Sequence, residues 1–229
     1  IKACMPMHTF GFPSRIVEIC EICKSYGIKV IEDAAEALGS ELNGQKIGTF
    51  GDIGVFSFNG NKIITAGGGG ALVTNNTKLA TRAKHLTTTG KTPHPYEFHH
   101  DTLAYNYRMP NLNAALLCAQ LEQLDLFLKN KRRLAETYKT FFENSSHTLR
   151  WEAKNTRANF WLICLEFENK ESRNLFLKET NENNVMTRPI WKLMFKLPMY
   201  EACFRDAQKN ATYLEERIVN IPSSYRKNG

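Results

Sequence analysis

The pattern of apolar and polar residues in the first part of the chain predicts a parallel β-sheet with a covering helix. Residues 3–9 and the β-branched run at 28–33 are typical of short buried strands. Between them, Ile16, Ile19 and Cys23 recur at the spacing of one helical face. A strand, a helix and a strand at these intervals predict a βαβ unit, whose two strands run parallel.

Two further strands are predicted at residues 52–58 and 70–75, and the segment between them contains Lys62 and four consecutive glycines, Gly67 to Gly70. Glycine permits positive φ and close approach of a ligand to the backbone, so four in a row indicate more than a turn. Ligands of parallel sheets gather beyond the carboxyl ends of the strands. Asp33, which ends the strand at 28–33, is therefore a site candidate by position alone.

The second half of the chain predicts a long helix and a separate small domain. From Leu112 to about Asn144, apolar residues recur at helical spacing without Gly or Pro, which indicates one long helix, broken at most once. A strand at 158–167 and helices at 172–184 and 209–218 follow. We therefore expect a large α/β domain portion at 1–110, a linking helix at 111–149 and a small α+β domain at 150–229.

Composition and charge exclude several classes of function. The 229 residues are 42% hydrophobic and 23% charged, which is ordinary for a globular protein, and no apolar run is long enough to span a bilayer. The net charge is +7, and its densest basic run is Lys129, Lys131, Arg132 and Arg133. Because no nucleic-acid-binding motif accompanies this run, we interpret it as a solvated helix face and expect neither nucleic acid nor membrane as a partner.

The cysteines and histidines predict neither disulfides nor a metal site. Six cysteines are scattered along the chain, and the single C-x-x-C pair, Cys20 and Cys23, lies on the predicted first helix, where thiols behave as small core residues. This usage favours a reducing, cytoplasmic location. His94, His99 and His100 lack the spacing and the carboxylates of a metal site, so we predict no bound metal.

Three residues in the N-terminal part together indicate one cofactor. Lys62 follows a buried strand and precedes the glycine run, where a lysine can lose its proton and attack a carbonyl group. Asp33 is a carboxylate that could pair with a protonated pyridine nitrogen, and the Ser57 hydroxyl could bind a phosphate oxygen. Taken singly, they could be a surface lysine, a helix cap and a strand residue. Their joint occurrence in this order predicts a pyridoxal 5'-phosphate (PLP) site.

The segment from residue 30 to 76, VIEDAAEALGSELNGQKIGTFGDIGVFSFNGNKIITAGGGGALVTNN, resembles the core of the DegT/StrS-type sugar aminotransferases. These are PLP-dependent transferases of fold type I, the aspartate aminotransferase-like α/β fold. The resemblance implies that Lys62 forms the covalent bond to PLP, that Asp33 pairs with its ring nitrogen and that Ser57 binds its phosphate. The run YNYRMPNLNAAL resembles the family's NYR segment, which implies that Asn106 reaches the cofactor of a neighbouring subunit in a homodimer with shared active sites.

The chain departs from the family pattern at one site position. Family members usually carry Gln or His three residues after the aspartate, packed by the ring hydroxyl of the cofactor, whereas this chain has Glu36. The run TRPIWKLMFKLPMY resembles a landmark of the family's small domain, so Arg188 and Trp191 are candidate substrate contacts. The family's phosphate turn and ring-stacking aromatic lie in an N-terminal part that we expect to be missing from these 229 residues.

The reaction implied by the resemblance is a transamination in polysaccharide biosynthesis. Glutamate would supply the amino group, and the 4-keto carbon of a nucleotide-linked deoxysugar would receive it. A UDP-linked amino sugar is the first expectation for this substrate and a GDP-perosamine precursor the second. The alternative is a non-catalytic relative that keeps the fold for binding or regulation, and the presence of Lys62 argues against it.

Overall fold

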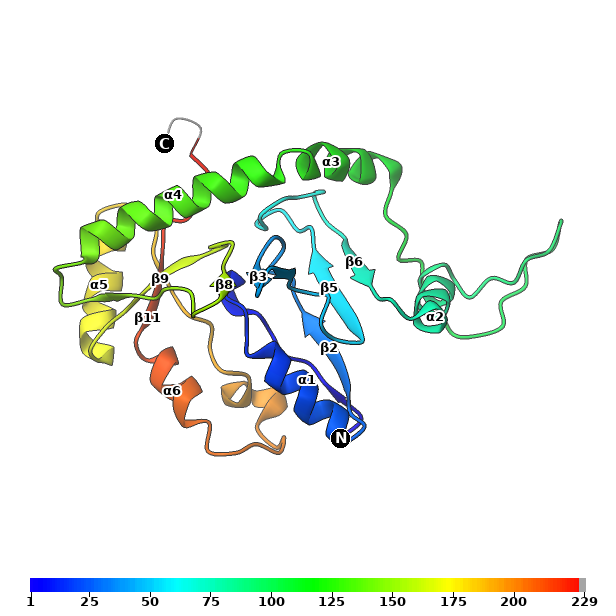
Figure 1. Ribbon diagram of the computed structural model, residues 1–229, viewed down its shortest axis with the longest axis horizontal. Helices are drawn as coiled ribbons and strands as arrows, with labels where there is room; N and C mark the ends of the chain where they lie inside the picture. Colours follow the sequence, from blue (N-terminus) through cyan, green and yellow to red (C-terminus); the bar gives the residue numbers. More distant parts are fainter. Residues whose placement is uncertain (227–229) are drawn as a thin grey trace. The chain divides into compact units, whose positions relative to one another are not determined.

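The structure is a computed structural model that describes residues 1–226, and it divides the chain into two compact units. Unit 1 comprises residues 1–128 and 152–159, and unit 2 comprises residues 129–151 and those from Phe160 onward. Each unit has its own sheet, shown in Figure 1.

The four-stranded sheet of unit 1 has the strand order β1-β2-β5-β6, and Figure 1 labels the last three of these strands. The parallel strands are β1 (Ala3–Cys4), β2 (Lys29–Asp33) and β5 (Ile53–Ser57), and α1 (Ile16–Ser25) connects the first two. The predicted βαβ unit is therefore confirmed. The last strand, β6 (Gly70–Val73), runs antiparallel to β5. Parallel neighbours usually need a helical crossover, and residues 58–69 contain no helix, so the chain returns antiparallel.

Helix α1 covers the sheet with its apolar face. Ile16 and Cys23 are buried against Val30, and Cys20 packs at the margin of the same cluster. Burial raises the pKa of the Cys23 thiol, which is the behaviour of an unreactive core residue. The interpretation of the C-x-x-C pair as core thiols is confirmed.

Residues 152–159, which follow the long helical region in the chain, belong to unit 1. This segment contributes β8 (Thr156–Arg157), which pairs antiparallel with β3 (Glu41–Leu42); β3 pairs in turn with β4 (Gln45–Lys46). The contacts of residues 152–159 group them with unit 1 and not with the small domain that the sequence predicts for them.

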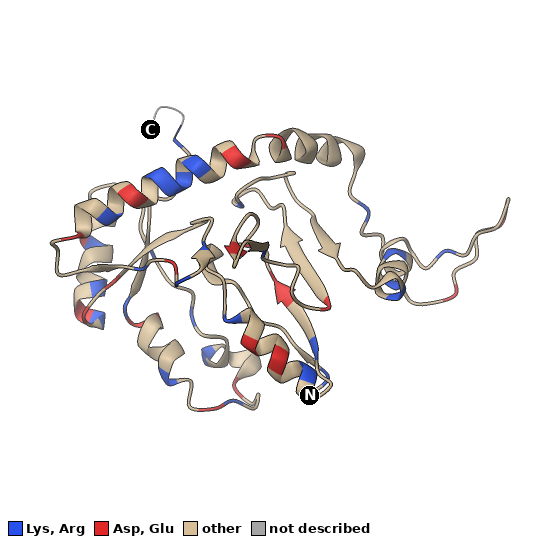
Figure 2. Ribbon diagram, in the orientation of Figure 1, with Lys and Arg blue, Asp and Glu red and all other residues tan. Residues whose placement is uncertain are grey.

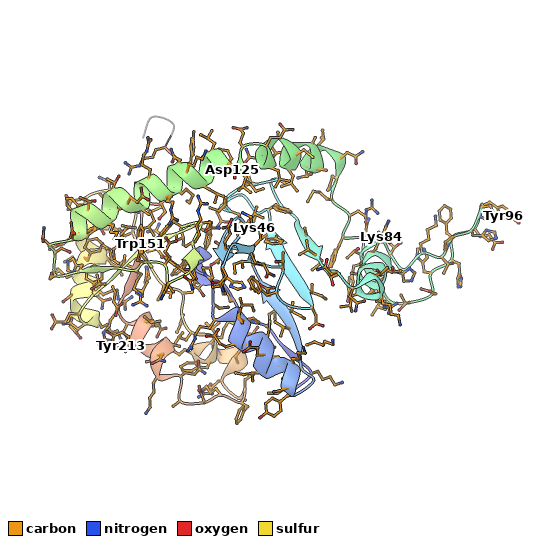
Figure 3. The ribbon with its side chains drawn as sticks, in the orientation of Figure 1. Lys46, Lys84, Tyr96, Asp125, Trp151 and Tyr213 are labelled. Atoms are coloured by element: carbon orange, nitrogen blue, oxygen red, sulfur yellow. The ribbon has the colours of Figure 1, made fainter. Side chains whose placement is uncertain are left out.

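The predicted long helix consists of two helices. These are α3 (Asn111–Leu121) and α4 (Leu124–Phe142), and the division between the units falls inside α4 after Leu128. Ahead of them lie α2 (Thr77–Thr87) and an extended segment, residues 88–110, with Tyr96 at its far end (Figure 3).

Unit 2 has an antiparallel sheet with the order β10-β11-β9-β7. Its central strands, β9 (Ile163–Glu166) and β11 (Ile218–Ile221), are largely buried, and its edge strands are β10 (Arg188–Pro189) and β7 (Thr148–Leu149). The helical elements are α5 (Lys170–Glu182), α6 (Lys209–Glu215) and the 3₁₀ turns η2 (Met194–Lys196) and η3 (Pro198–Tyr200). These elements make unit 2 an α+β unit.

The basic run on α4, coloured blue in Figure 2, is not simply a solvated face, because Lys131 is buried; this corrects the sequence interpretation. Lys131 is buried in unit 2 and donates a hydrogen bond to the Ser223 carbonyl oxygen, and burial lowers its pKa to about 8. The Arg132 guanidinium lies 5.5 Å from the centre of the Phe160 ring. These two cations hold α4 to its own unit, so the basic run is partly structural.

Glu32, on the central strand β2, is a fully buried carboxylate with several hydrogen bonds. Its Oε1 accepts from the backbone amides of Phe50 and Gly51, both at 2.6 Å, and its Oε2 accepts from Gly48 at 2.9 Å and lies 3.2 Å from His8 Nε2. The Ser14 amide donates to Nδ1 of the same histidine, so Nε2 carries the proton that faces Glu32. Burial alone would raise the pKa of Glu32, but the His8 and amide hydrogen bonds outweigh it and the pKa lies below the usual range.

We predict that Glu32→Gln destabilises unit 1 by about 3 kcal/mol at neutral pH, because an amide cannot accept all four hydrogen bonds. A carboxylate whose pKa is lowered by folding stabilises the folded state above its ordinary value of 4.5, and that stabilisation is lost as pH falls through the lower folded value. The difference in unfolding free energy between variant and wild type, measured by urea denaturation, should therefore shrink below about pH 4.

The matched control is Glu18→Gln, which changes an exposed carboxylate on α1 and should leave the denaturation midpoint nearly unchanged. Equal midpoints for Glu32→Gln and wild type at neutral pH would contradict the structural role of Glu32.

Candidate functional site

Two of the predicted residues lie at the carboxyl ends of neighbouring strands in the unit 1 sheet. Asp33 ends β2 and Ser57 ends β5, and the register of these parallel strands pairs Asp33 with Val55, two residues before Ser57. The Asp33 carboxylate is half-buried and accepts from the Ala35 amide at 3.1 Å, while its backbone oxygen accepts from His8. Neighbouring parallel strands thus end in a carboxylate and a hydroxyl.

Lys62 lies on the connection between β5 and β6. Backbone hydrogen bonds join the two ends of this connection. Phe58 donates to the Gly69 carbonyl and Ala66 donates to the Phe58 carbonyl, both at 3.0 Å. Phe58, Ile64 and Ala66 form a buried cluster beneath this connection. The Lys62 side chain is only 14% exposed, so the local fold holds its amine inside the unit rather than in solvent.

The Lys62 amine lies 3.7 Å from Glu36 Oε1, and the Glu36 side chain is only 5% exposed. The other oxygen, Oε2, accepts a hydrogen bond of 2.7 Å from the backbone amide of Phe10. Burial raises the pKa of the Glu36 carboxyl above its usual range, and the nearby Asp33 charge adds to this. The Phe10 amide and the Lys62 charge act in the opposite direction. The structure thus brings Asp33, Glu36 and Lys62 into one electrostatic group.

These residues fit the chemistry of a PLP site. A carboxylate at Asp33, a hydroxyl at Ser57 and an amine at Lys62 are the groups that a pyridine nitrogen, a phosphate and an aldehyde require. Gly67 and Gly69 are exposed and have φ values of +77° and +86°, so the glycine run that follows Lys62 in the chain has accessible backbone.

Asn106 lies apart from this group, on the extended segment between α2 and α3. Its side chain is exposed, and its backbone forms an isolated antiparallel bridge with Thr88. The neighbouring rings of Tyr105 and Tyr107 are stacked with centres 5.1 Å apart.

Arg188 and Trp191 belong to unit 2. The Arg188 guanidinium donates to Asn181 Oδ1 at 3.0 Å and to the Thr187 carbonyl at 2.9 Å. Trp191 stacks on Trp161 with ring centres 6.2 Å apart, and 47% of its surface remains exposed. Both side chains are therefore held by their own unit.

Sequence reasoning missed two contributors to the site, the Phe10 amide and Asn159. Asn159 is 2% exposed, and its side-chain nitrogen donates to the carbonyl oxygens of Glu36 at 2.7 Å and Leu38 at 2.9 Å. Asn159 lies 123 positions from Glu36 in the chain, and a backbone amide is present at nearly every residue, so neither contribution has a local signal.

The histidine-bearing segment does not form a cluster of metal ligands. His85 Nε2 lies 2.6 Å from Asp101, and His100 Nδ1 lies 2.8 Å from the Thr89 carbonyl oxygen. Among residues 1–226, no three His, Cys, Asp or Glu side chains are grouped so that they could hold a metal ion. None of the helices in this part of the chain combines the length and hydrophobicity that a membrane span requires.

The chain is similar to several sugar aminotransferases. GDP-perosamine synthase of Escherichia coli O157:H7 is 39% identical over 224 residues, which are 97% of this chain and 60% of that protein. UDP-4-amino-4,6-dideoxy-N-acetyl-beta-L-altrosamine transaminase of Campylobacter jejuni is 37% identical over 131 residues, 57% of this chain and 35% of that protein. The crystal structure of the aminotransferase TlmJ from Streptoalloteichus hindustanus superposes with a TM-score of 0.91 at 24% identity, over 97% of this chain and 60% of that one.

The chain thus spans about 60% of the length of the full-length relatives that it matches. The superposition confirms the predicted fold class, an α/β fold of the PLP-dependent transferase type. The family model of the DegT/DnrJ/EryC1/StrS aminotransferases matches residues 1–227. The chain therefore belongs to the DegT/DnrJ/EryC1/StrS aminotransferase family.

Proposed function

We propose that this chain forms the lysine-bearing part of a PLP-dependent aminotransferase that moves an amino group from glutamate to a 4-keto carbon of a nucleotide-linked deoxysugar. The observation that carries the proposal is the buried pairing of Lys62 with Glu36 at the sheet edge that also holds Asp33 and Ser57. Membership of an aminotransferase family supports the same reaction class.

Each residue has a defined role in this proposal. When bound, PLP supplies an aldehyde for the amino group and a ring that withdraws electrons from the reacting carbon. Lys62 would hold the aldehyde of the cofactor through Nζ and would carry a proton at that atom. Asp33 keeps the ring nitrogen protonated through its charge, and the Ser57 hydroxyl donates to a phosphate oxygen.

The sugar substrate is proposed from chemistry and similarity together. A GDP-linked 4-keto sugar is supported by the similarity to GDP-perosamine synthases, and a UDP-linked amino sugar by the similarity to the altrosamine transaminase. A net charge of +7 favours association with a diphosphate. Arg188 and Trp191 are proposed to contact this substrate through a charge-assisted hydrogen bond and ring stacking.

A homodimer with shared active sites is part of the proposal. The extended segment of residues 88–110 exposes large apolar side chains, namely Tyr96, Phe98, Leu103, Tyr105 and Tyr107, which are 52% to 84% exposed. Exposed apolar groups on this scale favour burial against another protein surface. We propose that a second copy covers them and that Asn106 reaches the phosphate of that copy's cofactor. A cytoplasmic location stays a prediction.

The first test locates the covalent attachment. After PLP is added to the purified protein, borohydride reduction and peptide mapping should place the pyridoxyl label on Lys62, because its amine is held inside unit 1. A Lys62→Arg variant, which keeps the charge, should remain unlabelled. A label on Lys46 or Lys78 in the wild type would overturn the attachment site.

The second test concerns Asp33. We expect Asp33→Asn to lower turnover by at least about 10²-fold, since an amide has no charge to keep the ring nitrogen protonated. Stability should change little, because the amide oxygen can still accept from Ala35. Asp52→Asn is the control: it weakens contacts with Lys29 and Val30 outside the site and should reduce stability rather than turnover. Unchanged turnover in Asp33→Asn with cofactor bound would mean that another group holds the nitrogen.

The third test addresses the shared site through subunit mixing. Lys62→Ala and Asn106→Ala should each be inactive alone. When the two variants are unfolded together and refolded, half of the dimers are mixed and each mixed dimer regains one intact site, so about a quarter of wild-type activity should return. No recovery on mixing, with mixed dimers verified by mass spectrometry, would contradict the role of Asn106 in the neighbouring site.

A further inference from the structure

Asn159 closes a ring of hydrogen bonds that joins three segments of unit 1. Its side-chain nitrogen donates to the carbonyl oxygens of Glu36 and Leu38, and its backbone amide donates to Ser40 Oγ at 3.0 Å. The same Ser40 hydroxyl donates to the Gly11 carbonyl oxygen at 2.7 Å. The ring therefore connects residues 9–11, residues 36–40 and the returning segment 152–159, and Ser40 and Asn159 are both buried.

The ring continues through the Glu36 side chain. Phe10, which precedes Gly11, donates its amide to Glu36 Oε2 at 2.7 Å. Phe10 is 3% exposed and has φ 60°, a left-handed conformation that is uncommon for a residue with a side chain. Such a conformation persists only where the surrounding structure imposes it.

Gly11 is part of the same ring of hydrogen bonds, and its backbone conformation is unusual. Gly11 has φ +91°, and a Cβ atom added there would lie 1.8 Å from Asn159 Oδ1. Glycine is therefore required at this position both for its backbone angle and for the space that Asn159 occupies. The turn of residues 9–11 and the Asn159 side chain fit each other, and together they aim the Phe10 amide at Glu36.

We propose that Asn159 is a positioning residue that holds the Glu36 carboxylate against the Lys62 amine, an inference that rests on the proposed role of Lys62. With Oε2 held by Phe10, Oε1 faces Lys62 Nζ at 3.7 Å. A proton that leaves Nζ can be taken up at Oε1, which converts the charged pair into a neutral amine and a neutral acid without loss of charge balance. Glu36 is thus the group that accepts the proton when Lys62 becomes a nucleophile.

Burial supports this use of Glu36. Desolvation raises the pKa of its carboxyl, so the protonated form is more accessible than for an exposed glutamate. If the ring of hydrogen bonds loosens, water reaches the carboxylate, and the titration midpoint of Glu36 should return toward that of an ordinary glutamate.

The test is a carboxyl-carbon NMR titration of ¹³C-glutamate-labelled protein without cofactor, with the Glu36 resonance identified by its absence in Glu36→Gln. Asn159→Ala should lower the Glu36 midpoint, because both side-chain donors to the 36–38 backbone are removed. The matched control is Asn76→Ala, which removes two hydrogen bonds at the start of α2, also in unit 1. It should reduce stability and leave the Glu36 midpoint unchanged.

If Asn159→Ala does not fold, Ser40→Ala tests the same ring, since it removes one acceptor for Asn159 and one donor to Gly11. It should shift the Glu36 midpoint in the same direction by a smaller amount. An unchanged midpoint in a folded Asn159→Ala or Ser40→Ala protein overturns the positioning role, as does an equal shift in Asn76→Ala.

Borohydride labelling of the wild type separates this inference from the proposed function. If Lys62 is labelled and the Glu36 midpoint does not respond to Asn159, the positioning role fails alone. If the midpoint responds and Lys62 is not labelled, the proposed function fails, and with it the use of Glu36 as proton acceptor.

Discussion

The buried charge of Glu32 is the constraint on which the rest of unit 1 depends. A carboxylate without solvent is tolerated only if its oxygens are fully hydrogen-bonded, and here the amides of residues 48, 50 and 51 and the His8 ring supply those bonds. The donors come from the segment after β1 and from the connection between β4 and β5. Both segments are therefore tied to the central strand, and Asp33, the next residue, takes its place at the sheet edge as a consequence.

Two buried carboxylates four positions apart serve different purposes because their surroundings differ. Glu32 has three amide donors and an imidazole, so it remains an anion and acts structurally. Glu36 has one amide donor and an amine at 3.7 Å, and burial raises its pKa. The surroundings thus move the pKa values of the two carboxyls in opposite directions. The two residues are of the same type, so the difference between the structural glutamate and the candidate site glutamate lies in the number of hydrogen bonds that each carboxylate accepts.

The site depends on contacts between segments that are far apart in the chain. Lys62 and Ser57 flank one connection, Asp33 and Glu36 follow one strand, and Asn159 arrives from beyond α4. The returning segment contributes both β8 and Asn159, so the small β4-β3-β8 sheet and the hydrogen bond to the Glu36 carbonyl depend on the same residues. Loss of that segment would therefore affect the geometry around Lys62 as well as the edge of the fold.

The sequence by itself determined the parallel strands and the helix that covers them, and it supplied the candidate cofactor residues, whose roles stay a proposal. Strand and helix periods are local, and the lysine motif is contiguous. It did not reveal the antiparallel return of β6, the burial of Lys131 or the roles of Glu32 and His8. Only the tertiary structure decided these features. The role of a charged residue within a buried strand depends on its hydrogen-bond donors, and these come from backbone that is distant in the sequence. The hydrogen bond between Asn159 and Glu36 was also decided by the tertiary structure. It joins residues 123 positions apart, and no periodicity or motif in the sequence indicates it.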